Sequence, residues 1–192
     1  MAYVTYTTKA LVCGTFKRNT SDSSYLLFTR EAGMLYADAR SVREEKSRQR
    51  YALQDFSLIK VSLIKGKRGW KIGSVNCLSN FYQEAEDKSA RGSVVSIFRL
   101  LRRFLRGEEP AKELFDLSHS GLEILKKTIV EREFVESVIK LKILTNLGYV
   151  NSEKIPKAVN HNDLHTLASD FDPIIAREVT NIYAQAIDVS QL

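Results

Sequence analysis

Three side chains near the C-terminus have the chemistry of a metal site. His161 and His165 are four residues apart, which would place both on one face of a helix, and Asp163 stands between them. A nuclease that uses these three residues is one hypothesis for the chain. The surrounding run NHNDLH, however, is typical of a polar helix start, where such side chains cap the helix or face water. We favour this second interpretation, and we predict neither a bound metal nor a cofactor.

Other patterns that would indicate an enzyme are missing from the sequence. The chain has no glycine-rich phosphate loop, and no serine stands in the context of a nucleophile elbow. Adjacent carboxylates occur at Glu44-Glu45 and Glu108-Glu109, but both pairs lie in charged stretches that favour solvation. A general acid needs a cleft that raises its pKa. We therefore predict that the chain is not an enzyme.

A larger group of residues has the chemistry of phosphate binding. Basic side chains dominate residues 40–50, where only two glutamates oppose them, and they recur in residues 65–71. The candidates are Arg40, Arg43, Lys46, Arg48, Arg50, Lys65, Lys67, Arg68 and Lys71. Arginine suits this role because its planar fork binds phosphate with two hydrogen bonds. We predict a nucleic-acid site here; the alternative is a basic surface that is merely solvated.

Aromatic rings among these cations could stack on bases, as in domains that bind single strands. Trp70 starts a predicted strand beside Lys67 and Arg68, so it is a candidate for stacking or for packing at the rim. Tyr51 is a further candidate. Tyr36 and Phe56 are also candidates for stacking, but both alternate with polar neighbours, and we expect these two rings to fill the interior of a barrel.

The overall composition is that of a globular protein with an uneven charge. The net charge is +6 over 192 residues, but residues 1–80 carry an excess of basic side chains and residues 81–192 a small excess of acidic ones. This asymmetry favours a polyanionic partner for the first part. Cys13 and Cys77 match neither a zinc site nor a disulfide framework, and we expect both to be core thiols in a cytoplasmic protein. Neither a membrane-spanning run nor a signal-peptide pattern is found.

The elements that would position the cations are five short strands in the first 80 residues. Each is rich in β-branched or aromatic residues and is bounded by turn-forming residues. We predict strands at Tyr3–Val12, Ser24–Thr29, Met34–Ala39, Ser57–Ile64 and Trp70–Val75. Five strands in so short a chain fit a closed barrel of the OB type, with the basic runs as connections on its rim.

The remainder has helical periodicity, so we predict an α+β protein with an OB-fold domain at 1–80 and an α-helical domain at 81–192. Apolar residues recur every three or four positions in each helix. The predicted helices are Ser93–Arg106, a second with Pro110 in its first turn, Glu131–Leu147, a short one at Asn162–Ser169, and a last one that starts at Asp172-Pro173. A stripe of Arg99, Arg102, Arg103 and Arg106 could extend a phosphate track, but we favour a solvated face paired with Glu108, Glu109 or Glu113.

Several short motifs resemble a known family. They are Phe28-Thr29-Arg30-Glu31-x-Gly33, Ala39-Arg40, Lys46-Ser47-Arg48 and Leu53-Gln54-x-Phe56 in the first half, and Glu113-Leu114-Phe115 and Leu141-Lys142-Ile143-Leu144-x-x-Leu147-Gly148-Tyr149 in the second. Together they resemble RecO, the bacterial DNA repair and recombination mediator. Many members carry four zinc-binding cysteines after the Leu-Gly-Tyr segment; Val150–Lys154 stands there instead, so no structural zinc is expected. Asp38 also replaces a glycine that is common before the Ala-Arg pair.

The resemblance implies an OB domain followed by a helical domain. It implies binding of single- and double-stranded DNA, annealing of complementary strands, and work with RecR to load the recombinase RecA onto DNA coated by single-strand-binding protein (SSB). The helical domain would receive the SSB tail. The residues themselves leave two other hypotheses open: a protein-interaction adaptor that does not bind DNA, and a domain that binds RNA through the same phosphate contacts.

Overall fold

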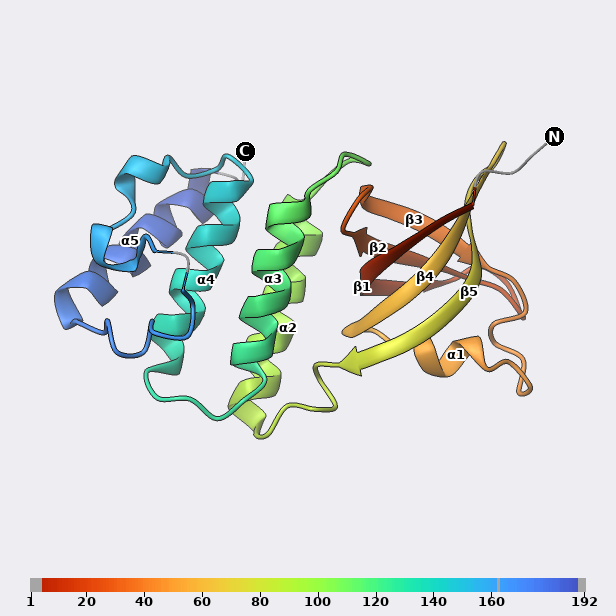
Figure 1. Ribbon diagram of the computed structural model, residues 1–192, viewed down its shortest axis with the longest axis horizontal. Helices are drawn as coiled ribbons and strands as arrows, with labels where there is room; N and C mark the ends of the chain where they lie inside the picture. The colour runs from red at the N-terminus through yellow and green to blue at the C-terminus, as the bar shows by residue number, and fades with distance from the viewer. Residues whose placement is uncertain (1–4, 162, 190–192) are drawn as a thin grey trace.

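The computed structural model describes residues 5–161 and 163–189. Its first part is a closed barrel with the strand order β1-β2-β3-β5-β4. The strands are β1 (Thr5–Lys17), β2 (Ser23–Thr29), β3 (Gly33–Ala39), β4 (Ser57–Gly66) and β5 (Gly69–Asn80). β3 and β5 pair in parallel, and the other neighbours pair antiparallel. A short helix, α1 (Gln49–Ala52), connects β3 to β4 (Figure 1). This architecture confirms the predicted OB-like barrel.

The barrel interior is filled by small and branched side chains at alternate strand positions. Val12, Leu27, Leu35, Ile59 and Leu63 are almost completely buried there. Alternation follows from the pleat of a strand, which sends successive side chains to opposite faces. The same rule sends the residues between them outward, where some face solvent and others face the helices.

The second part is helical, and it lies on one side of the barrel (Figure 1). Its elements are α2 (Lys88–Phe104), α3 (Lys112–Leu125), α4 (Arg132–Asn146), α5 (Pro173–Val189) and two short 3₁₀ helices at Ser152–Lys154 and Lys157–Val159. Asp87 caps α2, because its Oδ1 accepts a hydrogen bond from the Ala90 backbone N–H at 2.7 Å. Asp172 caps α5 in the same way, through Ile174 N–H at 2.7 Å, as the Asp-Pro pair predicts.

A shared apolar core joins the barrel to the helices. Outward-facing residues of β1 and β2, such as Cys13 and Leu26, belong to the same buried cluster as the apolar side of α2. Phe28 and Phe115 meet edge to face, with ring centroids 5.3 Å apart. The connection between α2 and α3 also contacts the barrel, since Met34 N–H donates to the Gly107 carbonyl at 2.9 Å. α2 therefore has a fixed position against the outer face of β1 and β2.

Several predicted boundaries were wrong because pairing partners decide where a strand ends. β1 continues past Val12 to Lys17 and β5 continues to Asn80, since each has partner strands along that length. Tyr3 and Val4, which we placed in the first strand, lie outside the described residues. α3 begins at Lys112, so Pro110 precedes it rather than occupying its first turn.

Residues 163–169, predicted as helix, form turns instead, and Asn162 lies outside the described residues. The turns are closed by short-range bonds such as Ser169 N–H to the Thr166 carbonyl at 2.8 Å. α1 was not predicted, because four residues are too few to show helical periodicity. No helix in the described ranges is long and apolar enough to cross a membrane.

Three expectations of burial were wrong. Tyr36 is 58% exposed, because β3 presents Leu35 and Ala37 to the interior and Tyr36 to the outside. Phe56 is half-buried between the barrel and α2, with its ring centroid 5.2 Å from that of Phe98. Cys77 is exposed on β5, whereas Cys13 is buried as expected.

Candidate nucleic-acid interface

Connections from three parts of the barrel surround a hollow at one end of it. The hollow has a volume of about 550 Å³. It is lined mainly by Arg18, Asn19, Asp22, Asp38, Arg40, Lys67, Arg68 and Lys71. These residues come from the β1–β2 turn, the end of β3 and the β4–β5 hairpin. We call this site the loop hollow. It brings together Arg40, Lys67, Arg68 and Lys71, which the sequence analysis named.

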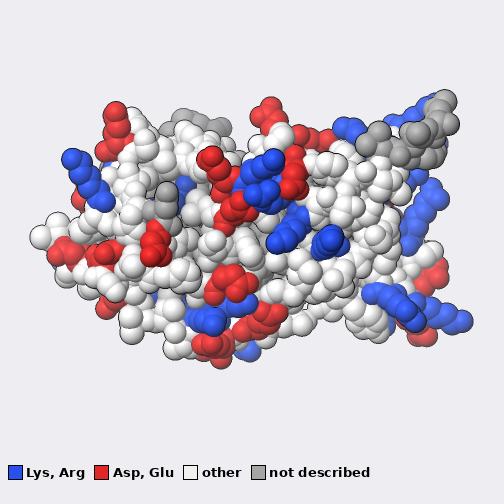
Figure 2. Space-filling view, viewed as in Figure 1, with Lys and Arg blue, Asp and Glu red and all other residues white. Residues whose placement is uncertain are grey.

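Strand pairing explains the convergence. The parallel register of β3 and β5 sets Asp38 opposite Lys71, and the antiparallel register of β2 and β3 sets Ser23 opposite Ala39. The end of β1, the start of β2, the end of β3 and the start of β5 therefore lie together. Figure 2 shows Lys and Arg prevailing at this end of the molecule, whereas Asp and Glu are common over the helices.

The two carboxylates of the loop hollow have internal partners. Asp38 forms an ion pair with Arg18, with Nε and Oδ1 3.2 Å apart. Asp22 accepts hydrogen bonds from the Asn19 side chain and from the Ser41 backbone N–H at 2.8 Å, and these bonds lower its pKa. Within the part of the chain that is described, Arg40, Lys67, Arg68 and Lys71 form no ion pair. Arg40 acts on Asp22 through its charge, which helps to lower the pKa of that carboxyl group. All four cations remain open to a ligand.

The rest of the run from residue 40 to residue 50 has other contacts. Arg43 ties the β3–α1 connection to the β1–β2 turn: its guanidinium donates to the Asn19 carbonyl, and its backbone N–H donates to the Ser21 carbonyl at 3.0 Å. Arg50 lies over the Tyr51 ring, with Cζ 4.8 Å from the centroid. Lys46 and Arg48 are exposed and do not line the loop hollow. Of this basic run, Arg40 lines the loop hollow and Arg43 ties two connections together. Lys46, Arg48 and Arg50 lie in or near α1.

Lys65 and Trp70 face the helical part rather than the loop hollow. Trp70 Nε1 donates to Glu108 Oε2 at 3.0 Å, and Lys65 Nζ lies 3.3 Å from the same oxygen. The pKa of Glu108 is lowered, first by the Trp70 hydrogen bond and then by Lys65. Trp70 is half-buried and packs against the barrel core. The geometry thus favours rim packing for Trp70 over free stacking.

The outer face of the barrel carries aromatic and basic residues that the sequence analysis missed. Phe16 on β1 is 39% exposed, and its ring centroid lies 5.8 Å from that of Tyr36 on β3. Arg18 lies two residues beyond Phe16 and reaches the loop hollow. Counting alternate positions from Ala10 and Val12, which face the interior, would place Phe16 inside the barrel. The irregularity in the pairing of β1 between Val12 and Gly14 shifts the register, so Phe16 faces outward instead.

Comparison with known proteins identifies the family. No family model matches the chain. A DNA repair protein RecO of Desulfitobacterium hafniense (strain DSM 10664 / DCB-2) is 31% identical over 144 residues, which is 75% of this chain and 52% of that protein. RecO of Myxococcus xanthus is 31% identical over 118 residues, 61% of this chain and 48% of the relative. RecO of Alkaliphilus metalliredigens is 25% identical over 141 residues, 73% and 57% respectively.

The chain belongs to the RecO family. It spans about half the length of the curated relatives it matches. Leu53 is buried in the barrel core and anchors the connection after β3, whereas Tyr51, a candidate for stacking, is exposed.

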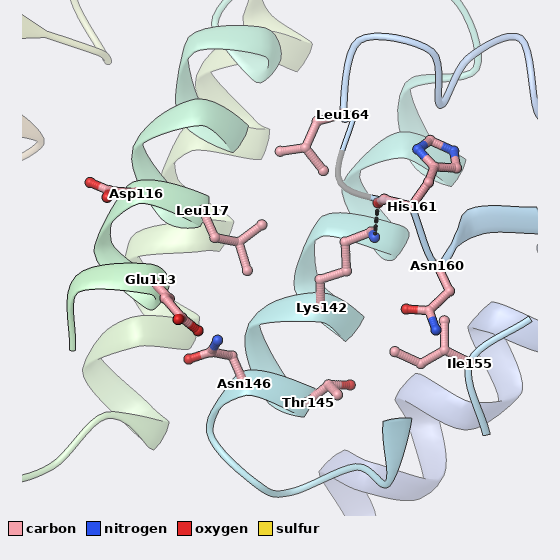
Figure 3. A pocket seen from close by; sticks show the side chains of 10 residues that line it. All are labelled: Glu113, Asp116, Leu117, Lys142, Thr145, Asn146, Ile155, Asn160, His161 and Leu164. Atoms are coloured by element: carbon pink, nitrogen blue, oxygen red, sulfur yellow. Dashed lines mark hydrogen bonds between the residues drawn. The ribbon is translucent and has the colours of Figure 1, made fainter. Parts of the chain in front are cut away.

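The histidines of this RecO family member do not converge on a metal site. His161 Nε2 lies 2.7 Å from Asp170 Oδ2, and His161 lines a hollow of about 570 Å³ next to α4. In that hollow Lys142 Nζ donates to the His161 carbonyl at 2.6 Å, and burial lowers the Lys142 pKa (Figure 3). His165 is exposed and lines a different hollow. No cluster of three metal-binding side chains occurs among the residues described. This geometry does not support the nuclease hypothesis.

The predicted arginine stripe is exposed, as expected for solvated side chains, but only Arg99, Arg102 and Arg103 lie on α2, because the helix ends at Phe104 before Arg106. Its predicted pairing with Glu108, Glu109 or Glu113 is not seen in the described ranges, where Glu108 pairs with Lys65 instead. Arg103 lies over the Phe104 ring, with Cζ 5.0 Å from the centroid.

In this member of the RecO family the segment after Gly148 forms the 3₁₀ helix Ser152–Lys154.

Proposed function

We propose that this chain is a DNA repair protein that binds single- and double-stranded DNA through the loop hollow. The observation that carries the proposal is the meeting of Arg40 with Lys67, Arg68 and Lys71 in one hollow, without ion pairs among the described residues. Cations grouped in this way attract phosphate and hold a backbone in register without reading its sequence. Little base preference is therefore expected.

The mechanism that we propose is annealing without covalent chemistry. Two complementary strands repel each other through their phosphates. A cationic site that holds both lowers this repulsion, and base pairing then supplies the free energy. No bond is made or broken, so the role needs no catalytic residues, and we propose a mediator rather than an enzyme.

The partners follow from family membership and are part of the proposal. Residues 1–80 would act as the DNA-binding domain, and residues 81–192 would act as the domain for protein partners. We propose that the chain works with RecR, receives the SSB tail on its helical part, and so helps to load RecA in the cytoplasm. The relatives are DNA repair proteins, which supports a role in DNA repair in general.

The test is the salt dependence of DNA binding. If the cations Arg40, Lys67, Arg68 and Lys71 each neutralise one phosphate, they contribute a slope of about −2.8 to log K against log salt on a single strand. Replacing all four by alanine should remove that contribution. The matched control replaces Lys112, Lys154, Lys157 and Arg177, which are exposed on the helical part. Equal loss in both variants would mean that net charge alone governs binding.

Two alternatives have distinct outcomes in the same experiments. An adaptor that does not bind DNA would give no gel shift with an oligonucleotide even at low salt. An RNA-binding domain would prefer the RNA strand when RNA and DNA of one sequence compete. Strand annealing measured on the four-residue variant then connects binding to the proposed activity, since annealing should fall together with affinity.

A further inference from the structure

Two large aromatic rings lie side by side on the solvent face of the barrel. Phe16 and Tyr36 are 39% and 58% exposed, and their ring planes are inclined at 57° with centroids 5.8 Å apart. We call them the ring pair. Phe16 lies on β1 and Tyr36 on β3, and β2 runs between these strands. Leu26 of β2 pairs with Gly14 on one side and with Tyr36 on the other, so Phe16 is two residues from the position level with Tyr36. Adjacent exposed rings of this size are typical of a surface that binds a ligand.

A cation from the helical part lies beside the ring pair. A Cβ atom placed on Gly14 would lie 3.4 Å from Phe16 Cε2 and 3.5 Å from Arg102 Cζ. The Phe16 ring and the Arg102 guanidinium therefore both lie next to Gly14, on the outer face of β1. Arg102 is exposed and forms no ion pair within residues 5–161 and 163–189.

The loop hollow begins on the opposite side of the ring pair. Asp38 lies two residues beyond Tyr36 and so shares the outward face of β3, and Arg18 directly follows the end of β1, two residues beyond Phe16. Arg18 and Asp38 pair with each other and line the loop hollow. The ring pair therefore stands between Arg102 and the cations of the hollow. This order of cation, aromatic rings and cations is the one that a single strand requires, because bases stack while the flanking phosphates are neutralised.

We propose that Phe16 and Tyr36 form a stacking platform for the unpaired bases of a single strand, and that Arg102 binds a phosphate at its helical edge. This inference rests on the proposed DNA binding and deepens it. Duplex DNA keeps its bases stacked on one another and uses the loop hollow alone. The platform thus makes the chain favour single strands, and it makes α2 part of the DNA site.

The test compares three ligands at one salt concentration: a thymidine oligonucleotide, an abasic strand of the same length, and a duplex. The unaltered protein should bind the abasic strand more weakly than the thymidine strand, because the phosphates remain and the stacking bases are gone. The variant that combines Phe16→Leu and Tyr36→Leu should lose roughly 5- to 100-fold in affinity for the thymidine strand. It should keep the affinity for the duplex and the salt slope, since no charge is removed.

Controls separate stacking from other losses. Tyr149→Leu removes an exposed ring on the helical part, and thymidine-strand affinity should be unchanged. Arg102→Ala should make the single-strand salt slope less steep by about 0.7. If the leucine variant does not fold, the comparison of thymidine and abasic strands with the unaltered protein still decides the matter. Equal affinity for the thymidine strand and the abasic strand would overturn the stacking platform alone. Absence of all DNA binding would overturn the proposed function as well.

Discussion

Arg40 directly follows β3, Lys71 lies near the start of β5, and both line the same hollow. They meet because β3 and β5 pair in parallel, with Asp38 opposite Lys71. A parallel pair brings the end of one strand near positions of the other that are distant in the chain. The proposed DNA site is based on this relationship. Some cations of the barrel line the hollow, such as Arg40 and Lys71, and others, such as Lys46, do not.

The first prediction concerns that separation. Lys71→Ala should make the single-strand salt slope less steep by about 0.7, because one phosphate contact is lost. Lys46→Ala removes the same charge from a position that does not line the hollow, and its slope should change less. Fluorescence anisotropy over a series of salt concentrations measures both. If the two variants lose slope equally, the loop hollow is not the centre of the site.

The second prediction concerns the contact between Glu108 and the barrel. Because Trp70 and Lys65 lower the Glu108 pKa, the folded protein binds this proton less readily than the unfolded chain does. The contact therefore stabilises the fold above the ordinary glutamate pKa, and the stability is lost as the pH falls through the lowered value. The effect should stay below about 1 kcal/mol, since the pair is largely exposed.

Urea unfolding between pH 6 and pH 3 measures this effect. Glu108→Gln should show a flatter dependence of the unfolding free energy on pH in the acidic range. Glu113→Gln, which changes a nearby exposed carboxylate, serves as the control. An unaltered pH profile for Glu108→Gln would show that the contact adds nothing to stability.

The third prediction concerns Gly33, where the barrel meets the α2–α3 connection. Its φ is +64°, and a Cβ atom there would lie 2.3 Å from the Glu109 carbonyl oxygen. Gly33→Ala should destabilise the protein by about 2 kcal/mol or more, because backbone strain and a clash add together. Gly92→Ala in α2 meets nothing within 4 Å and should stabilise the protein by about 0.5–1 kcal/mol. Thermal unfolding should move in opposite directions for the two variants.

The fourth prediction concerns the two thiols. Burial raises the pKa of Cys13 to about 12, and Cys77 is exposed on β5. A thiol reagent at pH 8 should label one cysteine in the folded protein and both after denaturation, because the thiolate is the reactive form. Cys77→Ser should abolish labelling of the folded protein. Rapid labelling of Cys13 would mean that the packed contact between β1 and α2 opens readily in the folded protein.

Local signals predicted most of the elements correctly. Val12, Leu27 and Ile59 belong to three strands that were predicted, and their side chains fill the interior of the barrel. The Asp-Pro pair at Asp172 marks the start of α5 through contacts within one turn, so no distant residue is needed. The predicted secondary structure was wrong where contacts with distant residues decide it. Examples are the extension of β1 to Lys17 and the turns that replace a predicted helix after His161.

The candidate site was only partly predictable. The residue types around Arg40 and Lys67 indicated phosphate binding, but the sequence analysis grouped Lys65 and Trp70 with them, and the structure turns these two toward Glu108. Phe16 and Arg102 were not considered together at all, since one belongs to a strand and the other to a helix that follows the barrel.

The amino-acid sequence alone determined the barrel-then-helix order, the basic character of the first part and the family resemblance, because these depend on local periodicity, composition and short motifs. Only the tertiary structure decided which cations share a hollow, that Tyr36 faces outward, and that α2 lies beside β1. Those features depend on strand register and on the apolar surface that the barrel shares with the helices. Both are set by contacts between residues far apart in the chain.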